Sequence, residues 1–197
     1  YNTYGGSWLM ASKIKVDQIQ TADGTGTIAL QNQLSGMTTA SLPTLTSAQM
    51  PAGHILQIQK SGTHSETSTT SSSFVDTNMS VGITPSSTSS KIVIMYTGQC
   101  RVDGNASELR MGFKVIRKVS GGSDTAIVNT SGSSEILQVR GTPSEVNSMQ
   151  AGFWLDEPNT TSAITYMFQI NKHPDTTNSR VYASSYGSQM IAYEVKV

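Results

Sequence analysis

The sequence has few charged residues, and their charges cancel. Of its 197 residues, 13 are Lys or Arg and 13 are Asp or Glu, so the formal net charge is zero and the charged fraction is 13%. An ordinary globular domain carries about twice that fraction. Because a neutral chain has no net field to attract polyanions, we expect it to bind no nucleic acid and no anionic membrane surface.

Cysteine and long hydrophobic runs are also scarce. The single cysteine, Cys100, lies in the apolar segment KIVIMYTGQCRV and has no intramolecular disulfide partner. We expect a buried, unreactive thiol, and stability that comes from packing or assembly. No stretch of 18 apolar residues occurs, so we expect no membrane insertion.

Signatures of catalysis and metal binding are missing as well. The three histidines, His54, His64 and His173, are far apart in the sequence and do not have zincin-type spacing. No nucleophile elbow or phosphate-binding loop occurs, and DGTG at 23–26 is interpreted as a turn because a strand pattern follows it. We therefore expect no enzyme, no cofactor and no metal site within one chain. A ring of His54 or His173 from three symmetry-related chains remains an alternative.

Ser and Thr are abundant, at roughly a quarter of the chain, and alternating apolar patterns dominate after Pro51. About ten strands are expected, among them GHILQIQK, SFVDTNMSVGITP (a short strand followed by a second), KIVIMYTGQCRV and MIAYEVKV. Turn sequences such as PSSTSS and HPDTTNS separate them, without helical patterns in between. This organisation predicts an all-β fold, an antiparallel β-sandwich or jelly roll over residues 51–197, with the KIVIMYTGQCRV and MIAYEVKV strands at its centre.

The region before Pro51 has a different pattern. Residues 13–30 alternate like the two arms of a small hairpin, and a thinly apolar linker follows up to residue 50. Because an isolated hairpin is marginal in water, its apolar side chains are expected to contact other subunits. These candidate anchoring residues are Ile14, Val16, Ile19, Ile28 and Leu30. Residues 1–50 are thus predicted to be an anchor and linker. Met10 is a candidate translation start, which leaves open whether residues 1–9 are an extension.

Aromatic residues give the candidate recognition surface. Trp154 follows Phe153, and in a strand one of the two is expected to face the core and the other the solvent. Tyr182 and Tyr186, together with Arg180, lie near a predicted loop and could form a polar aromatic patch. Packing in the core or between subunits is the alternative role for these side chains.

The order of these segments resembles a known group of proteins. The segment SKIKVDQIQTADGTGTIAL, the junction LPTLTSAQMPAGHILQIQ and the stretch TSTTSSSFVDTNMSVGITPSSTSSKIVIMY resemble bacteriophage tail-fibre-like and other virion structural proteins, especially of marine and cyanobacterial phages. The resemblance covers most of residues 11–96 and the strand at 190–197.

The resemblance implies a non-enzymatic homotrimer located in the virion. Its N-terminal segment would attach to other phage virion proteins, and its sandwich would project as a knob towards a host cell-surface glycan or protein. The chain has no shaft repeat, so a capsid decoration protein, either a cement or a head-fibre protein, remains an alternative to a tail fibre. A carbohydrate-binding module or a glycan-degrading enzyme is a further alternative.

Overall fold

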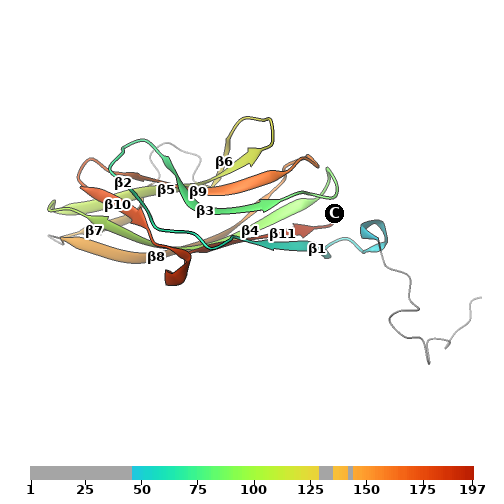
Figure 1. Cartoon of the computed structure of the whole chain (residues 1–197), viewed down its shortest axis with the longest axis horizontal. Helices are drawn as coiled ribbons and strands as arrows, with labels where there is room; N and C mark the ends of the chain where they lie inside the picture. The colour runs from blue at the N-terminus through green and yellow to red at the C-terminus, as the bar shows by residue number, and fades with distance from the viewer. Residues whose placement is uncertain (1–45, 129–134, 142–143) are drawn as a thin grey trace, which may run out of the picture. The chain divides into compact units, whose positions relative to one another are not determined.

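Two antiparallel sheets packed face to face form the body of the protein. The computed structural model describes residues 46–128, 135–141 and 144–197 (Figure 1). One sheet, called here the β4 sheet, has the strand order β1-β11-β4-β10-β2, and β8 pairs with the other side of β4. Its strands are β1 (Ile55–Lys60), β2 (Thr67–Thr69), β4 (Lys91–Asp103), β8 (Glu145–Asp156), β10 (Asn178–Val181) and β11 (Gln189–Val195).

The second sheet, called here the β9 sheet, has the order β3-β9-β5-β6, and β7 also pairs with β5. Its strands are β3 (Val75–Ile83), β5 (Glu108–Val119), β6 (Thr125–Val128), β7 (Glu135–Arg140) and β9 (Ile164–Lys172). Successive strands change sheet between β2 and β5 and again between β7 and β10, as in jelly rolls. The predicted all-β antiparallel sandwich is confirmed.

Helical structure in the described residues is limited to two single 3₁₀ turns, η2 (Ser47–Gln49) and η3 (Ser184–Tyr186). Pro51 follows η2 closely, which agrees with the poor fit of proline inside a helix. In this part of the chain, no helix is long and apolar enough to cross a membrane.

The core lies between the two sheets and is built from every second residue of the central strands. On β4 the side chains of Ile92, Ile94 and Tyr96 are buried, whereas the residues between them face outwards. The Tyr96 ring meets Phe113 of β5 and Phe168 of β9, each at a centroid distance of 5.7 Å. The predicted central positions of β4 and β11 are confirmed, because both have strand partners on each side.

Two details of the strand prediction were wrong. SFVDTNMSVGITP folds as the single strand β3, whose pairing with β9 shifts register between Asp76 and Ser80. Thr77 supports this irregularity, because its buried hydroxyl donates to the Phe168 carbonyl at 2.6 Å. The sequence reasoning also missed β2, since a strand of only Thr and Ser has no apolar alternation.

A buried carboxylate attaches the loop between β3 and β4 to the sandwich. Glu194 of β11 is fully buried and accepts hydrogen bonds from the Ser86 amide, the Ser90 hydroxyl and the Gln57 amide, each at 2.6 Å. Burial by itself raises the pKa of this group, but the hydrogen bonds outweigh it and lower the pKa below its ordinary value. The PSSTSS sequence is therefore a carboxylate-binding loop as well as a turn.

Predictions for the N-terminal part fall outside the described residues. These include the hairpin over 13–30, its turn, and the anchoring residues Ile14, Val16, Ile19, Ile28 and Leu30. The assignment of residues 1–50 to an anchor and linker and of residues 1–9 to an extension remains a prediction.

Candidate interaction surface

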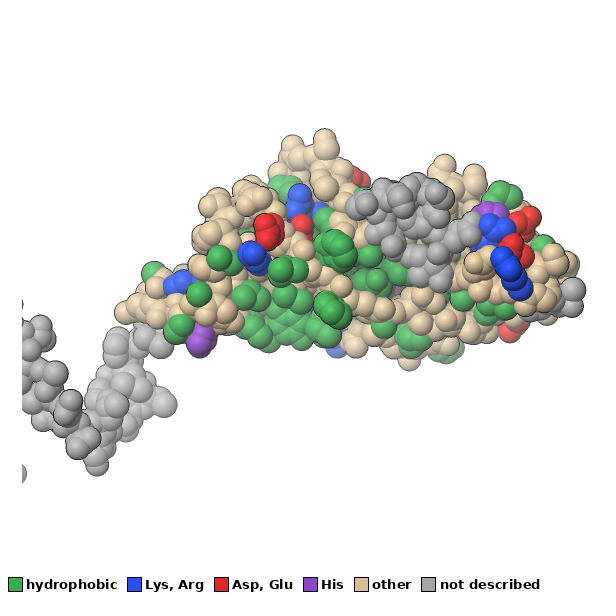
Figure 2. Space-filling view, turned by 180° about the vertical axis from the view of Figure 1, so that it is seen from behind, with side chains coloured by type: hydrophobic (Ala, Val, Ile, Leu, Met, Phe, Trp, Pro, Cys, Tyr) green, Lys and Arg blue, Asp and Glu red, His purple; other side chains and the backbone are tan. Residues whose placement is uncertain are grey.

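The outer face of the β4 sheet is unusually apolar at the end near β1. Directly paired residues of a sheet point to the same face, so the strand register gives rows of neighbouring side chains. One row crosses four strands as Ile58, Tyr193, Val93 and Leu155. The next row begins at Lys60 and continues with the apolar residues Ile191, Met95 and Phe153. Seen from behind, hydrophobic side chains gather near the middle of the surface (Figure 2).

Strand β8 forms one margin of this sheet. Among the described strands it pairs with β4 alone, over all twelve of its residues, so its other edge has no strand partner there. Such an edge presents unpaired N–H and C=O groups and is a template for further pairing. Phe153 is 77% exposed, and Met149 and Leu155 are about half exposed. The edge of β8 is therefore both apolar and accessible.

The expectation for Phe153 and Trp154 is half right. Phe153 pairs with Met95 on the outer face, and Trp154 pairs with the buried Ile94 on the inner face, so the two do point to opposite sides. Trp154 is nevertheless 47% exposed rather than part of the core. The reason is its place on a marginal strand, where the opposing sheet covers it only in part.

A shallow groove follows β8 on the outer face. It has a volume of about 430 Å³, and its walls include Met95, Phe153 and Ile191. Gly152 lies at its base, directly over the Tyr96 hydroxyl: a Cβ atom at position 152 would lie 2.6 Å from that oxygen. Glycine is thus required here for close approach of β8 to the core, rather than for backbone freedom.

Charged residues lie at the two ends of β8, and the residues between them are uncharged. Glu145 forms an ion pair with Arg101 at 2.5 Å, and beyond the other end Glu157 pairs with Lys91 at 2.8 Å. Asp156 is buried and accepts two hydrogen bonds from the Arg117 guanidinium. Residues 146–155 contain no charged side chain. This stretch also contains no lysine and no proline, the residues that commonly prevent an edge strand from pairing with another chain.

The other end of the β4 sheet is polar and aromatic. The rings of Tyr182 and Tyr186 are in contact at a centroid distance of 5.1 Å, and Tyr186 is 59% exposed. Arg180 of β10 lies beside them in sequence and forms ion pairs with Glu66 and Asp103. The structure thus places three of the four predicted recognition residues at one end of the sheet. Their role in recognition remains a prediction.

Trp154 does not belong to that group. It pairs with residue 94 of β4, whereas Arg180 pairs with Arg101, seven residues further along the same strand. At about 3.4 Å per residue, the two positions are on the order of 24 Å apart. They also lie on different faces of the sheet, because Ile94 points inwards and Arg101 outwards. Sequence reasoning did not select Met95, Met149 and Leu155, which lie on the apolar outer face along β4 and β8.

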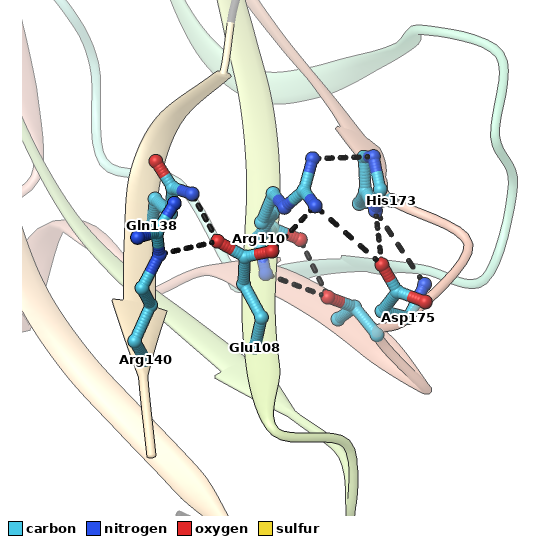
Figure 3. Close-up of polar contacts among 7 residues, drawn as sticks. Glu108, Arg110, Gln138, Arg140, His173 and Asp175 are labelled. Carbon is cyan, nitrogen blue, oxygen red and sulfur yellow. Dashed lines mark hydrogen bonds and ion pairs between the residues drawn. The ribbon is translucent and has the colours of Figure 1, made fainter.

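A second polar cluster lies on the β9 sheet (Figure 3). Arg110 of β5 donates to Glu108 at 2.5 Å and to the His173 Nε2 atom at 3.1 Å, and His173 Nδ1 lies 3.1 Å from Asp175. Hydrogen bonds from Gln138, Arg140 and Arg110 lower the pKa of Glu108 to about 2.

This arrangement connects two strands and the loop after β9, and it offers little to catalysis. A glutamate with so low a pKa is a poor general acid near neutral pH. The Nε2 atom of His173 faces a guanidinium, which is neither a nucleophile nor a proton acceptor. We therefore interpret the cluster as a structural clamp.

The structure also describes Cys100 and the side chains that could bind a metal ion. The Cys100 side chain is buried, as predicted, and burial raises the pKa of its thiol to about 12, which disfavours the reactive thiolate. Over residues 46–128, 135–141 and 144–197, no group of three His, Cys, Asp or Glu side chains could hold a metal ion.

Comparisons with known proteins give similar folds but no family. No protein-family model and no curated protein sequence matches the chain. The VP2 subviral particle of infectious bursal disease virus is similar in structure with a TM-score of 0.41 and 9% identity, over 71% of this chain and 32% of VP2, so the chain spans about a third of that protein.

Two similar structures of other kinds have lower TM-scores. Eiger TNF from S. frugiperda has a TM-score of 0.35 at 6% identity, over 73% of this chain and 94% of that chain. The CBM22-1 xylan-binding domain of Paenibacillus barcinonensis Xyn10C has a TM-score of 0.33 at 13% identity, over 75% and 99%. Likenesses at this level do not assign a function.

Proposed function

We propose that the chain is a non-enzymatic structural protein of a bacteriophage virion, a homotrimeric tail fibre or knob. It would attach to the particle through its N-terminal segment and contact the host surface with its sandwich. The observation that carries the structural role is the outer face of the β4 sheet, where exposed Phe153, Leu155 and Met95 adjoin an edge of β8 that pairs with no other described strand. A protein that functions alone rarely exposes such a surface, because it promotes association.

The virion and the phage come from the sequence resemblance. The quoted segments run from the anchor through the MPAG junction into β3 and β4, so they cover both the attachment region and the start of the sandwich. A neutral, hydroxyl-rich exterior also suits a particle surface that should not adhere to charged polymers.

The first test locates the chain in purified particles. Antibody labelling and quantitative mass spectrometry of phage virions should detect it, with tens of copies or fewer for a tail protein. Hundreds of copies would favour the alternative of a capsid decoration protein. Absence from intact virions would reject the proposed function in both forms.

The second test concerns attachment. Replacing Ile14, Val16 and Ile19 by Ser in the full chain should leave the unfolding midpoint of the sandwich unchanged and abolish incorporation into particles. Unchanged incorporation would contradict the anchoring role of residues 13–30. A matched control replaces Val197, an exposed apolar residue outside the strands, by Ser.

A carbohydrate-binding module is the second candidate, and one observation favours it. Tyr182 and Tyr186 form an exposed aromatic pair beside the Asn147 amide, to which the Tyr182 hydroxyl donates at 3.3 Å. Aromatic faces bordered by hydrogen-bonding groups are suited to sugar rings. A glycan array together with a reducing-sugar assay would test binding and hydrolysis, and Tyr186→Ala should abolish any binding found. No binding on the array and no release of reducing sugar would reject this candidate function.

A further inference from the structure

We propose that the free edge of β8 binds the same edge of a second copy of the chain, strand against strand, around a two-fold axis at Gly152. This inference rests on the proposed structural role and names a partner for that surface. The pairing would join two β4 sheets into one continuous sheet and satisfy the backbone groups that the edge leaves without a strand partner.

The side chains of β8 are self-complementary in this arrangement. With Gly152 opposite its own counterpart, Ala151 of one copy lies opposite Phe153 of the other, and Met149 lies opposite Leu155. All four residues have the same parity along the strand and therefore share the outer face with Met95. A large side chain thus meets a small one, and a flexible thioether meets a branched aliphatic group. Apolar cross-strand pairs of this kind stabilise sheets.

Charge also favours a second copy as the occupant. The edge between residues 146 and 155 is uncharged, and the charges that bound it are paired within their own chain. In the proposed register Glu157 falls opposite Asn147, and Asp156 falls opposite Ser148. In this register, therefore, no charged residue lies opposite another of the same sign, which is a common cost when two identical strands pair. A strongly basic or acidic partner would find no complementary charge along this edge.

The area available is sufficient for a reversible pair. At about 200 Å² for a whole aromatic side chain, the exposed fractions of Phe153 and Trp154 leave on the order of 250 Å² uncovered per copy. With the half-exposed Met149 and Leu155, two copies would bury at most on the order of 800–1,000 Å². This lies near the lower limit of about 1,000 Å² for a specific interface. We therefore expect a pair that forms at micromolar concentration and dissociates on dilution.

The pairing is compatible with the homotrimer that the resemblance implies, because two trimers joined by two-fold contacts give a hexamer. In either case the assembly contains an even number of copies. The full chain should therefore sediment as a dimer or a hexamer in analytical ultracentrifugation between about 1 μM and 1 mM. A monomer throughout this range, or a trimer alone, would overturn the inference.

Two substitutions test whether β8 is the surface involved. Phe153→Lys places a charge opposite Ala151 of the other copy and should raise the dissociation constant at least tenfold. Ile58→Lys is the matched control, since Ile58 is an exposed apolar residue on the same face but on β1. It should leave the dissociation constant unchanged. An equal effect of both substitutions would reject pairing through β8, provided that both variants keep the wild-type urea midpoint.

The register has its own test. In antiparallel pairs, opposite Cα atoms lie about 4.5–5.5 Å apart, which suits a disulfide. The double variant Met149→Cys/Leu155→Cys should therefore oxidise to a covalent dimer, whereas Met149→Cys alone should not. Cys100 will not interfere, because it is buried. Even-numbered assembly without this cross-link would contradict the register centred on Gly152.

Failure of this inference and failure of the proposed function would look different. A chain found in virions but only trimeric in solution would refute the pairing and leave the proposed function intact. A chain that pairs through β8 but is absent from virions would refute the role and leave the pairing intact.

Discussion

Strands β4 and β8 are neighbours of nearly equal length, yet they contribute to the protein in opposite ways. They pair along twelve residues, from Ile92–Asp156 to Asp103–Glu145. Every second residue of β4 is buried in the core, whereas the outward-facing residues of β8 are exposed and most of its inward-facing residues are only partly buried. Both strands carry large apolar residues, so composition does not account for the difference. The position of each strand accounts for it. β4 has described strands on both sides and is covered by the second sheet, whereas β8 has a described strand on one side only and is covered by the second sheet only in part.

The comparison indicates that the apolar residues of the two strands contribute to different processes, folding of one chain and association between chains. Those of β4 stabilise the fold of a single chain. Those of β8 add little to that stability in the isolated chain and become useful only when another surface covers them. Substitutions in each of the two strands can separate these contributions.

The largest difference is expected between Ile94→Ala and Phe153→Ala. Ile94 is fully buried, so its truncation should lower the free energy of unfolding by about 2–5 kcal/mol. Phe153 is largely exposed, and its truncation should change the stability of the single chain by about 0.5 kcal/mol or less. Urea denaturation at low protein concentration measures both values. Similar losses for the two variants would mean that β8 is covered within one chain.

An intermediate effect is expected at Gly152, where β8 meets the core. Gly152→Ala brings a methyl group against the Tyr96 side chain and should cost about 1–3 kcal/mol. Tyr96→Phe removes the hydroxyl that the methyl group meets first, so the double variant should recover part of this loss. Urea denaturation of the two single variants and the double variant gives the coupling energy. A coupling energy of zero would show that β8 does not rest on Tyr96.

The smallest effect is expected on lowering the pH, and it concerns the buried carboxylate of Glu194 and the exposed carboxylate of Glu157. The folded-state pKa of Glu194 lies below its ordinary value of 4.5. Its contribution to stability is therefore fully present above that value and is lost as the pH falls through the lowered folded-state pKa. Urea midpoints between pH 6 and about pH 3 should fall, and Glu194→Gln should flatten this dependence.

Glu157→Gln is the control for the acid experiment. Glu157 is an exposed partner of Lys91, and exposed ion pairs contribute little to stability. The variant should retain the wild-type dependence on pH. An equal flattening in both variants would contradict the special role of the buried carboxylate.

Sequence reasoning predicted the class of the fold well and the use of its strands less well. The length and apolar character of KIVIMYTGQCRV and MIAYEVKV identified two central strands, because central strands of a sandwich bury the most side chains. The same reasoning missed β2, whose Thr and Ser residues form a strand only because β10 lies beside them. It also divided β3 in two, since an irregular register with β9 has no signature in the sequence of one strand.

The candidate site was predicted only in part. Sequence proximity was sufficient to group Arg180, Tyr182 and Tyr186, which are within seven residues of one another. Trp154 was added to that group on residue type alone, and the structure separates it from the others. Phe153, Trp154 and Leu155 do form three consecutive large apolar residues in a strand, a pattern that indicates exposure of at least one of them.

By itself, the sequence determined that this protein is built from antiparallel strands, that its thiol is buried and that its surface is neutral, because alternation, turn residues and composition act locally. Only the tertiary structure decided which apolar strand lies in the core and which lies at the margin. That choice depends on strand order, which arises from pairings between residues far apart in the chain. The exposed edge of β8, and the partner proposed for it, follow from that order.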